Sequence, residues 1–374
     1  MTEVNMENDI KIVSSFNQKD KSYFKHVLFV GPHYNQLGGI ASVLEIYHKS
    51  IDDFNFISSY HKGSSIHNLL YFIKSLAKFI YILLTNRTIK IVHIHIAIKG
   101  SFIRKSIFLL IAKVLGKKTI LHIHSGFFKD FYESNKLVRP FIKFILNQPT
   151  LLIVLSDEWK SYFDTITNKK SIIINNPVIL PEHINQSIPG SPIKVLFLNR
   201  LVAEKGILDL LEFIKQNRDL LQGSFKFIIA GAGNAEAEML LAIKNNQLEN
   251  LIEFRGWVVG KAKEEIIKES DLFILTSYFE GLPMSILEAM SFGKSIIASN
   301  VGGIPRVVKH HQNGWLTEAG DIKSLKGIFQ QIKSQPEILE QYGERSLEIV
   351  QDYSPEKVTE SLNKIYASLI TTVN

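Results

Sequence analysis

Short runs of apolar residues recur along the chain, and most are followed by a polar or glycine-rich turn and then by a segment with helical periodicity. The runs predict buried strands at residues 27–30, 91–96, 119–126, 151–155, 172–175, 195–198, 227–230, 272–275 and 296–298. Runs that stay apolar without strict alternation are typical of strands buried on both faces of a parallel sheet. Such strands alternating with helices predict an α/β fold built on doubly wound sheets.

The chain is long enough for two such sheets. Its 374 residues exceed the ~250–300 residues at which a single core stops growing. The sequence Ile-Pro-Gly-Ser-Pro at 188–192 is typical of an interdomain linker. We therefore predict a first domain at 1–188, including an extension over the first 24 residues, and a second domain at 189–352.

Residues 271–308 combine two strands with two turns suited to a ligand. The strand at 272–275 leads through a polar loop to Pro283, which opens a helix where its missing N–H costs nothing. The strand at 296–298 ends at Gly302-Gly303, before a second helix. Ligands of open parallel sheets bind at the carboxyl ends of the strands. Both helix N-termini are therefore expected to face one crevice, where they suit a phosphate.

Two acidic residues belong to the same crevice. Glu280 lies in the loop, and Glu288 lies about 7 to 8 Å along the helix axis from the helix start near Pro283, at 1.5 Å per residue. The carboxyl pair of a retaining glycosidase is only ~5 to 5.5 Å apart. The two acids are therefore expected to address different parts of a long ligand such as a nucleotide sugar. The alternative is one loop acid and one solvated helix acid without a shared role.

This stretch resembles the E-x7-E region of retaining glycosyltransferase family 4, the glycosyl transferases group 1. The resemblance rests on EGLP at 280–283, on Glu288 and on the later Gly-Gly-x-Pro turn. It implies the GT-B fold, in which two Rossmann-like domains face an interdomain cleft. It also implies that Glu280 contacts the donor sugar and Glu288 the ribose of the nucleotide. One departure is Arg306, which stands where the family usually has Glu.

Three further motifs fit the same family. Gly38-Gly39 resembles the glycine loop of the first domain, which implies closeness to the donor diphosphate, although a plain turn is the alternative. His124 resembles the strand-end histidine that faces the donor sugar. Arg200 and Lys205 match the G-R-L-x-x-x-K-G pattern, with Asn199 in place of its glycine, and two cations there suit a leaving diphosphate. The final helix, 353–374, is expected to cross back to the first domain.

Histidines alternate along two of the predicted strands, which places His93 with His95 and His122 with His124 on common faces. A zinc site is one interpretation, but no acidic or cysteine partner lies nearby in the sequence. We therefore expect no metal site, and structural roles for His95 and His122. The chain has no cysteine and no D-x-D sequence, which agrees with a metal-independent reaction without a cofactor.

Basic residues are concentrated in the first domain. Residues 1–188 carry 23 Lys and Arg against 13 Asp and Glu, a net charge of +10, whereas 189–374 carry 20 against 23, a net charge of −3. A basic half could meet nucleic acid, an anionic membrane or an anionic acceptor. No nucleic-acid-binding motif is present. Residues 1–20 show no secretory signal, which predicts a cytoplasmic protein.

Two apolar stretches, 66–84 and 102–115, predict helices that carry cations. A membrane span needs ~20 residues almost free of charge, so neither is expected to span. Basic side chains beside Leu, Ile and Phe suit helices resting on an anionic membrane at its inner face. Helices packed on a sheet with basic outer positions are the alternative. The cations concerned are Lys74, Lys78, Arg104, Lys105 and Lys113.

The combined prediction is a retaining, metal-independent hexosyltransferase that moves a sugar from a UDP-sugar or GDP-sugar to a hydroxyl of a glycan or lipid-linked acceptor. The resemblance favours a role in bacterial surface polysaccharide synthesis. The alternative is a module that binds a nucleotide sugar without transferring it. The predicted catalytic residues are His124 and Glu280, and the predicted donor-binding residues are Gly38, Gly39, Arg200, Lys205, Gly281, Leu282, Pro283 and Glu288.

Overall fold

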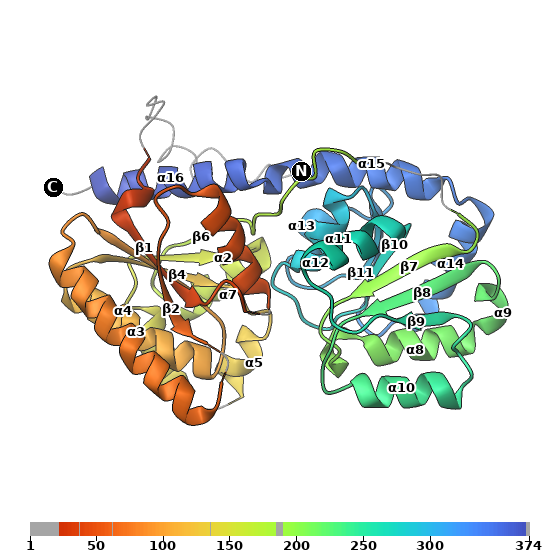
Figure 1. The fold of residues 1–374 in the computed structure, drawn as a ribbon, viewed down its shortest axis with the longest axis horizontal. Helices are drawn as coiled ribbons and strands as arrows, with labels where there is room; N and C mark the ends of the chain where they lie inside the picture. The colour runs from red at the N-terminus through yellow and green to blue at the C-terminus, as the bar shows by residue number, and fades with distance from the viewer. Residues whose placement is uncertain (1–21, 37, 62, 135, 185–189, 372–374) are drawn as a thin grey trace.

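The computed structural model describes residues 22–36, 38–61, 63–134, 136–184 and 190–371. Two parallel sheets of six strands, each flanked by helices, lie side by side (Figure 1). The predicted α/β fold with two doubly wound domains is confirmed. Most of the predicted extension, residues 1–21, and the first part of the predicted linker, residues 188–189, lie outside the described residues.

The first sheet has the strand order β2-β1-β3-β4-β5-β6. Its strands are β1 (Val27–Pro32), β2 (Asn55–Tyr60), β3 (Ile91–Ile96), β4 (Lys118–Ile123), β5 (Leu151–Val154) and β6 (Ser171–Ile173). Its helices are η1 (Phe24–His26), α2 (Gly39–Ser50), α3 (Ser65–Thr85), α4 (Gly100–Val114), α5 (Phe128–Glu133), α6 (Arg139–Leu146) and α7 (Asp157–Ile166). The apolar pattern does not predict β2, because Ser58 and Ser59 interrupt it. Ser59 is nevertheless buried, and its hydroxyl donates to the Gly31 carbonyl at 2.9 Å.

The second sheet has the strand order β12-β11-β10-β7-β8-β9. Its strands are β7 (Ile193–Leu198), β8 (Phe225–Ala230), β9 (Ile252–Phe254), β10 (Leu272–Leu275), β11 (Ser295–Ser299) and β12 (Gly314–Thr317). Its helices are η2 (Ala203–Lys205), α8 (Ile207–Gln216), α9 (Arg218–Leu221), α10 (Glu236–Asn245), α11 (Gly260–Glu269), α12 (Met284–Ser291), α13 (Ile304–Val307), α14 (Ile322–Ser334) and α15 (Ile338–Val350). The turn η3 (Gln351–Tyr353) then leads to α16 (Pro355–Thr371).

The last helix, α16, lies along the first domain rather than the second (Figure 1). The Tyr366 hydroxyl is 2.6 Å from His93 Nδ1 on β3, and the Tyr23 N–H donates to Asn363 Oδ1 at 2.8 Å. Helices α2 and α16 cover one face of the first sheet, and α3, α4 and α6 cover the other. The chain therefore ties its C-terminal segment to the domain with which it starts.

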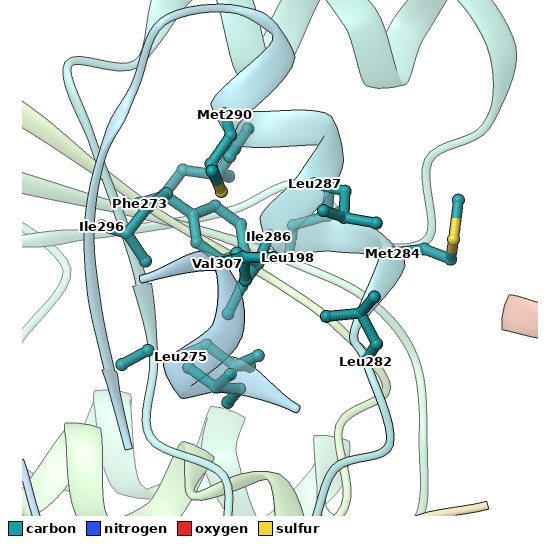
Figure 2. Packing of buried hydrophobic residues seen from close by; sticks show 14 of the residues in the cluster. Leu198, Phe273, Leu275, Leu282, Met284, Ile286, Leu287, Met290, Ile296 and Val307 are labelled. Carbon is teal, nitrogen blue, oxygen red and sulfur yellow. The ribbon is translucent and has the colours of Figure 1, made fainter. Parts of the chain in front are cut away.

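Helix α12 is held against the second sheet by its apolar face. Ile286, Leu287 and Met290 are fully buried, and Ile286 and Met290 lie near Phe273 of β10 (Figure 2). Burying such a side chain contributes roughly 1.5–3 kcal/mol. Met284, at the first position of the helix, points away from this cluster (Figure 2). The N-terminus of α12 is therefore fixed at a defined place relative to the sheet.

Candidate active site

A cavity of about 630 Å³ lies between the two domains, at the carboxyl ends of strands from both sheets. The first domain contributes the loops after β1 and β4, and the second contributes those after β7, β8 and β10 together with the start of α11. All ten predicted site residues line it: Gly38, Gly39, His124, Arg200, Lys205, Glu280, Gly281, Leu282, Pro283 and Glu288. The structure thus brings together residues that are up to 250 positions apart in the chain.

Glu280 is held in place by an ion pair inside the cavity wall. Lys205 Nζ lies 2.6 Å from Glu280 Oε1, and both side chains are nearly buried. The Ser277 hydroxyl donates to the same oxygen at 2.8 Å. Removing one partner of such a pair leaves an uncompensated buried charge, which is strongly destabilising. The predicted diphosphate-binding lysine is therefore engaged by the predicted sugar-binding acid in this state.

Glu288 also has a basic partner, which the sequence analysis did not predict. Lys263 of α11 places its Nζ 2.6 Å from Glu288 Oε1, and both residues line the cavity. Lys263 stands in the charged segment GKAKEEIIKE, where nothing separates it from the solvated lysines around it. Only the tertiary structure selects it.

Arg200 is the exposed cation of the cavity. Its backbone N–H donates to Asn199 Oδ1 at 2.7 Å, and Asn199 replaces a glycine of the family pattern. No ion pair to the guanidinium is found among the described residues. Arg200 is therefore available to an anionic ligand, whereas the charge of Lys205 is already paired with Glu280.

Three helix N-termini reach the cavity, those of α2, α11 and α12, and only that of α12 is one of the two that the sequence predicted. Pro283 caps α12 without a side-chain hydrogen bond, and Met284 and Ser285 line the cavity. The predicted second helix, α13, is only four residues long and its start does not line the cavity, because the Gly303 N–H donates to the Gly281 carbonyl at 2.6 Å. Helix α2, which starts after Gly38, takes its place.

Glycines allow the backbone of Glu280 to be enclosed from both domains. A Cβ on Gly126 of the first domain would lie 2.4 Å from the Glu280 carbonyl carbon. Gly302 has a φ of 57°, and a Cβ there would lie 1.9 Å from the Glu280 carbonyl oxygen. Backbone atoms cannot yield to such contacts, so both positions require glycine. Gly302 therefore supports Glu280 rather than facing the ligand.

His124 is an uncharged group in the wall on the first-domain side. Burial, and secondarily the charge of Lys105, lowers the pKa of His124 to about 3. Its Nε2 lies 2.8 Å from His95 Nδ1, so one of these nitrogens carries the shared proton. At neutral pH His124 can hydrogen-bond a sugar but cannot serve as a cationic acid.

The remaining histidines form a buried cluster behind His124. The ligand nitrogens of His93, His95 and His122 all lie within 4.8 Å of one another, an arrangement that could hold a metal ion. His93 Nε2 is 3.2 Å from His122 Nδ1, and the His93 Nδ1 contact with Tyr366 completes its pairing. The predicted sharing of faces is confirmed by the stacked His93 and His95 rings, 4.6 Å apart.

Arg306, the departure from the family pattern, joins the domains. Its Nη1 lies 2.7 Å from Asp157 Oδ2 on α7, across the interface. Asp157 is 79% exposed, and an ion pair with such an exposed partner contributes only about 0.2–1 kcal/mol. Arg306 does not line the cavity.

Known proteins that resemble this chain in sequence or structure are glycosyltransferases. Residues 181–348 match the model of the family described as glycosyl transferases group 1. AmsK of Erwinia amylovora, named as an amylovoran biosynthesis glycosyltransferase, is 28% identical over 194 residues, 48% of this chain and 47% of AmsK. The N-acetyl-alpha-D-glucosaminyl L-malate synthase of Bacillus anthracis is 32% identical over 146 residues, 39% of this chain and 38% of that protein. The chain thus spans about half the length, or less, of these curated relatives.

The structure of Anabaena Alr3699/HepE in complex with UDP and glucose superposes with a TM-score of 0.73 at 17% identity, covering 91% of this chain and 99% of that chain. Two facing six-stranded domains of this kind define the GT-B fold. The chain has this fold, and its residues 181–348 match the glycosyl transferases group 1. The predicted family and fold are confirmed.

Proposed function

We propose that the protein is a retaining glycosyltransferase that moves a hexose from a nucleoside-diphosphate sugar to a hydroxyl group. The observation that carries this proposal is the cavity between the domains, in which Glu280, Glu288, Arg200 and Lys205 meet at the N-terminus of α12. Acids that bind hydroxyls and cations that bind phosphate are the two chemistries that a nucleotide sugar requires. The UDP and glucose named for Alr3699/HepE support this choice of ligand class.

Different residues of the cavity bind different parts of the donor. Arg200 and the uncapped first turn of α12 hold the diphosphate, since helix N-termini and fixed cations favour anions. Glu288, oriented by Lys263, accepts from the ribose hydroxyls. Glu280 and neutral His124 bind the sugar. Positive charge in this set stabilises the leaving group, and we propose that the reaction requires no metal ion.

In the proposed reaction the bond from the sugar C1 to the diphosphate oxygen breaks, and a bond from C1 to the acceptor oxygen forms on the same face. The acceptor proton passes to the departing diphosphate. When the diphosphate enters, Lys205 can turn from Glu280 toward it and add its charge as the leaving group forms. Preorganised charge of this kind is worth about 2.7–4 kcal/mol of barrier per donor.

We further propose that the acceptor is a glycan or a lipid-linked glycan of a bacterial surface polysaccharide, used in the cytoplasm at the inner face of the membrane. The name of AmsK, a protein of amylovoran biosynthesis, supports the polysaccharide part of the proposal. The basic first domain supports an acceptor that carries negative charge.

A panel of UDP-sugars and GDP-sugars, read out as nucleoside diphosphate release by the purified full chain, tests the proposal. A transferase with this site releases diphosphate slowly from its own donor even without an acceptor. Tight binding of a donor with no release, with and without glycan acceptors, would show instead a module that only binds nucleotide sugars.

A further inference from the structure

Three helices of the first domain expose apolar side chains on one layer. The exposed residues include Ile66, Ile73 and Tyr81 of α3, Ile107 and Val114 of α4, and Phe144 of α6. Ile66 is 74% exposed, Tyr81 67% and Val114 85%. Single exposed apolar side chains are ordinary, but a contiguous set over several helices marks an interaction surface. We call this layer the outer helical face.

The three helices are neighbours with a common inner side. The rings of Phe72 on α3 and Phe108 on α4 are 5.8 Å apart, and those of Phe102 on α4 and Phe141 on α6 are 6.3 Å apart. On the inner side, Phe79 and other residues of all three helices form the core over the first sheet. The outer helical face is thus a fixed surface of the domain.

Helix α3 is long and apolar enough to cross a membrane, although the sequence predicted that it would not span one. Among the described residues it is the one helix long and apolar enough to cross a membrane, and most of it is exposed. Crossing would expose Phe79 and Leu83, which are buried against the sheet. An orientation along the membrane surface keeps these contacts and still covers Ile66, Ile73 and Tyr81.

The charge of this region has one sign. Residues 54–129 contain 12 Lys and Arg and no Asp or Glu. Lys74 and Lys78 flank the exposed apolar residues of α3, Lys113 lies at the end of α4 and Lys143 lies on α6, and all four are exposed. Long basic side chains beside apolar ones suit a lipid surface with anionic headgroups.

Two of the five predicted membrane-facing cations have other roles. Lys105 is buried and donates to the Ser101 hydroxyl at 2.9 Å. The Arg104 guanidinium lies over the Tyr60 ring, 4.8 Å from its centroid. The sequence did not reveal this, because two consecutive cations between Ile103 and Ser106 look like a solvated pair. Lys143 of α6 replaces them on the outer helical face.

A second copy of the chain fits this surface less well than a bilayer does. In a two-fold symmetric dimer the same patch meets itself. The cations of the outer helical face would then oppose one another, and α3, α4 and α6 contain no acidic residue that could pair with them. Anionic headgroups supply the missing charge.

We propose that the protein docks on an anionic lipid bilayer through the outer helical face, with the apolar side chains of α3, α4 and α6 inserted between headgroups. The proposal specifies how the lipid-linked acceptor of the proposed function would be met, but the docking itself depends on no catalytic step. Docking differs from the non-specific electrostatic attraction of a basic protein to anionic lipids, because the apolar side chains of the outer helical face contribute part of the binding.

Co-sedimentation of the full chain with vesicles of phosphatidylcholine alone, or of phosphatidylcholine with phosphatidylglycerol, tests the docking. Binding to the anionic vesicles should exceed binding to the neutral ones by about tenfold or more and should weaken as salt is raised. Ile73→Glu with Ile107→Glu should abolish it, and Lys74→Gln with Lys78→Gln should reduce it by about tenfold.

Matched controls lie on the second domain. Leu240→Glu with Leu241→Glu exchanges exposed apolar residues of α10, and Lys244→Gln with Lys261→Gln removes two exposed cations, so both should leave vesicle binding unchanged. Circular dichroism and thermal unfolding establish that all variants are folded.

Three results would overturn the docking. They are equal binding to both kinds of vesicle, binding to neither, and self-association in solution that the Ile73→Glu, Ile107→Glu variant abolishes. Diphosphate release in vesicle-free solution separates this proposal from the proposed function. A folded outer-face variant that releases diphosphate but no longer binds vesicles supports the docking without affecting the transferase proposal. Wild-type protein that binds vesicles but releases no diphosphate contradicts the transferase proposal and leaves the docking intact.

Discussion

Each domain presents a six-stranded parallel sheet to the cavity, but the two domains place different chemistry at its edge. The first domain ends β3 and β4 with four histidines, and burial lowers the pKa of His93 and of His124 to about 3. The second domain places two ion pairs there, formed by Glu280 and Glu288 with their lysines. At neutral pH the histidines at the edge of the first sheet are uncharged, whereas the edge of the second sheet carries charged pairs.

The difference indicates how the ligand is divided between the domains. Charged groups in fixed positions suit the diphosphate and the ribose of a donor, whereas neutral rings suit the hydroxyls of a sugar. The family model matches residues 181–348, which lie almost wholly in the charged half. The second domain is thus the part that the family model matches.

The largest expected effect is acid destabilisation of the first domain alone. Burial is the main cause that lowers the pKa of His93, His95, His122 and His124. The unfolded chain therefore binds more protons below about pH 6.5, and each histidine removes up to about 1.4 kcal/mol of unfolding free energy per pH unit below that value. Above pH 6.5 the buried histidines remove no unfolding free energy, because they are uncharged in both the folded and the unfolded chain. Hydrogen exchange at pH 7.5 and pH 5, corrected for intrinsic rates, should show lost protection in β3 and β4.

The same experiment has an internal control. No histidine of the described second domain is buried, so β10 and β11 should keep their protection at pH 5. Equal loss in both sheets would mean that the acid effect is global and that the histidine cluster does not distinguish the domains.

Much of the donor half could be predicted from the sequence, because its signals are local. Residues 272–275 were predicted as a strand and form β10 with those bounds, since the run is apolar and the loop after it is polar. Glu280 and Glu288 follow at a recognisable spacing. These features need no knowledge of distant residues.

What the sequence could not give depends on tertiary contacts. Lys263 is selected from its neighbours only by the position of Glu288. The start of α13 is kept from the cavity by the Gly303 hydrogen bond to Gly281, although its Gly-Pro pattern suggests a ligand-facing helix. The edge strand β2 breaks the apolar pattern at serines whose burial becomes evident only when β1 lies beside them.

The next largest effect concerns the charged wall. Arg200→Ala with Lys205→Ala should raise the transfer barrier by ~3 kcal/mol or more, because two cations near the leaving diphosphate are removed. Steady-state rates of diphosphate release measure this. A matched variant, Lys215→Ala with Arg218→Ala, removes two cations outside the cavity and should keep the wild-type rate. Unchanged turnover of the Arg200 and Lys205 variant would place the diphosphate elsewhere.

A smaller effect should separate binding from chemistry. Lys263→Ala leaves Glu288 without its partner, which should raise KM for the donor by about tenfold, the equivalent of one lost charge-assisted hydrogen bond, with little change in kcat. Initial rates over a range of donor concentrations report both constants. Lys261→Ala, on the same helix but outside the cavity, is the control. A fall in kcat at constant KM would contradict the assignment of Glu288 to the ribose.

The smallest expected effect concerns the contact between domains. Arg306→Gln should reduce stability by about 1 kcal/mol or less, because its partner Asp157 is largely exposed. Thermal unfolding of this variant, of Asp157→Asn and of the double variant forms a cycle that isolates the pair. A coupling free energy of several kcal/mol would show that this ion pair, rather than the backbone contacts at Glu280, holds the domains together.

The most direct test of the central claim is the rate at which Glu280→Gln releases nucleoside diphosphate from the donor that the wild-type protein uses. The variant keeps the shape of the side chain and an oxygen for Lys205 and Ser277, but removes the charge beside the sugar. Thermal unfolding should show a folded protein, and Glu265→Gln, an exposed acid of α11, should behave as wild type. We predict a loss of about 100-fold or more, by analogy with the removal of one preorganised group. A folded Glu280→Gln protein with the wild-type rate would contradict the assignment of this cavity as the site of sugar transfer.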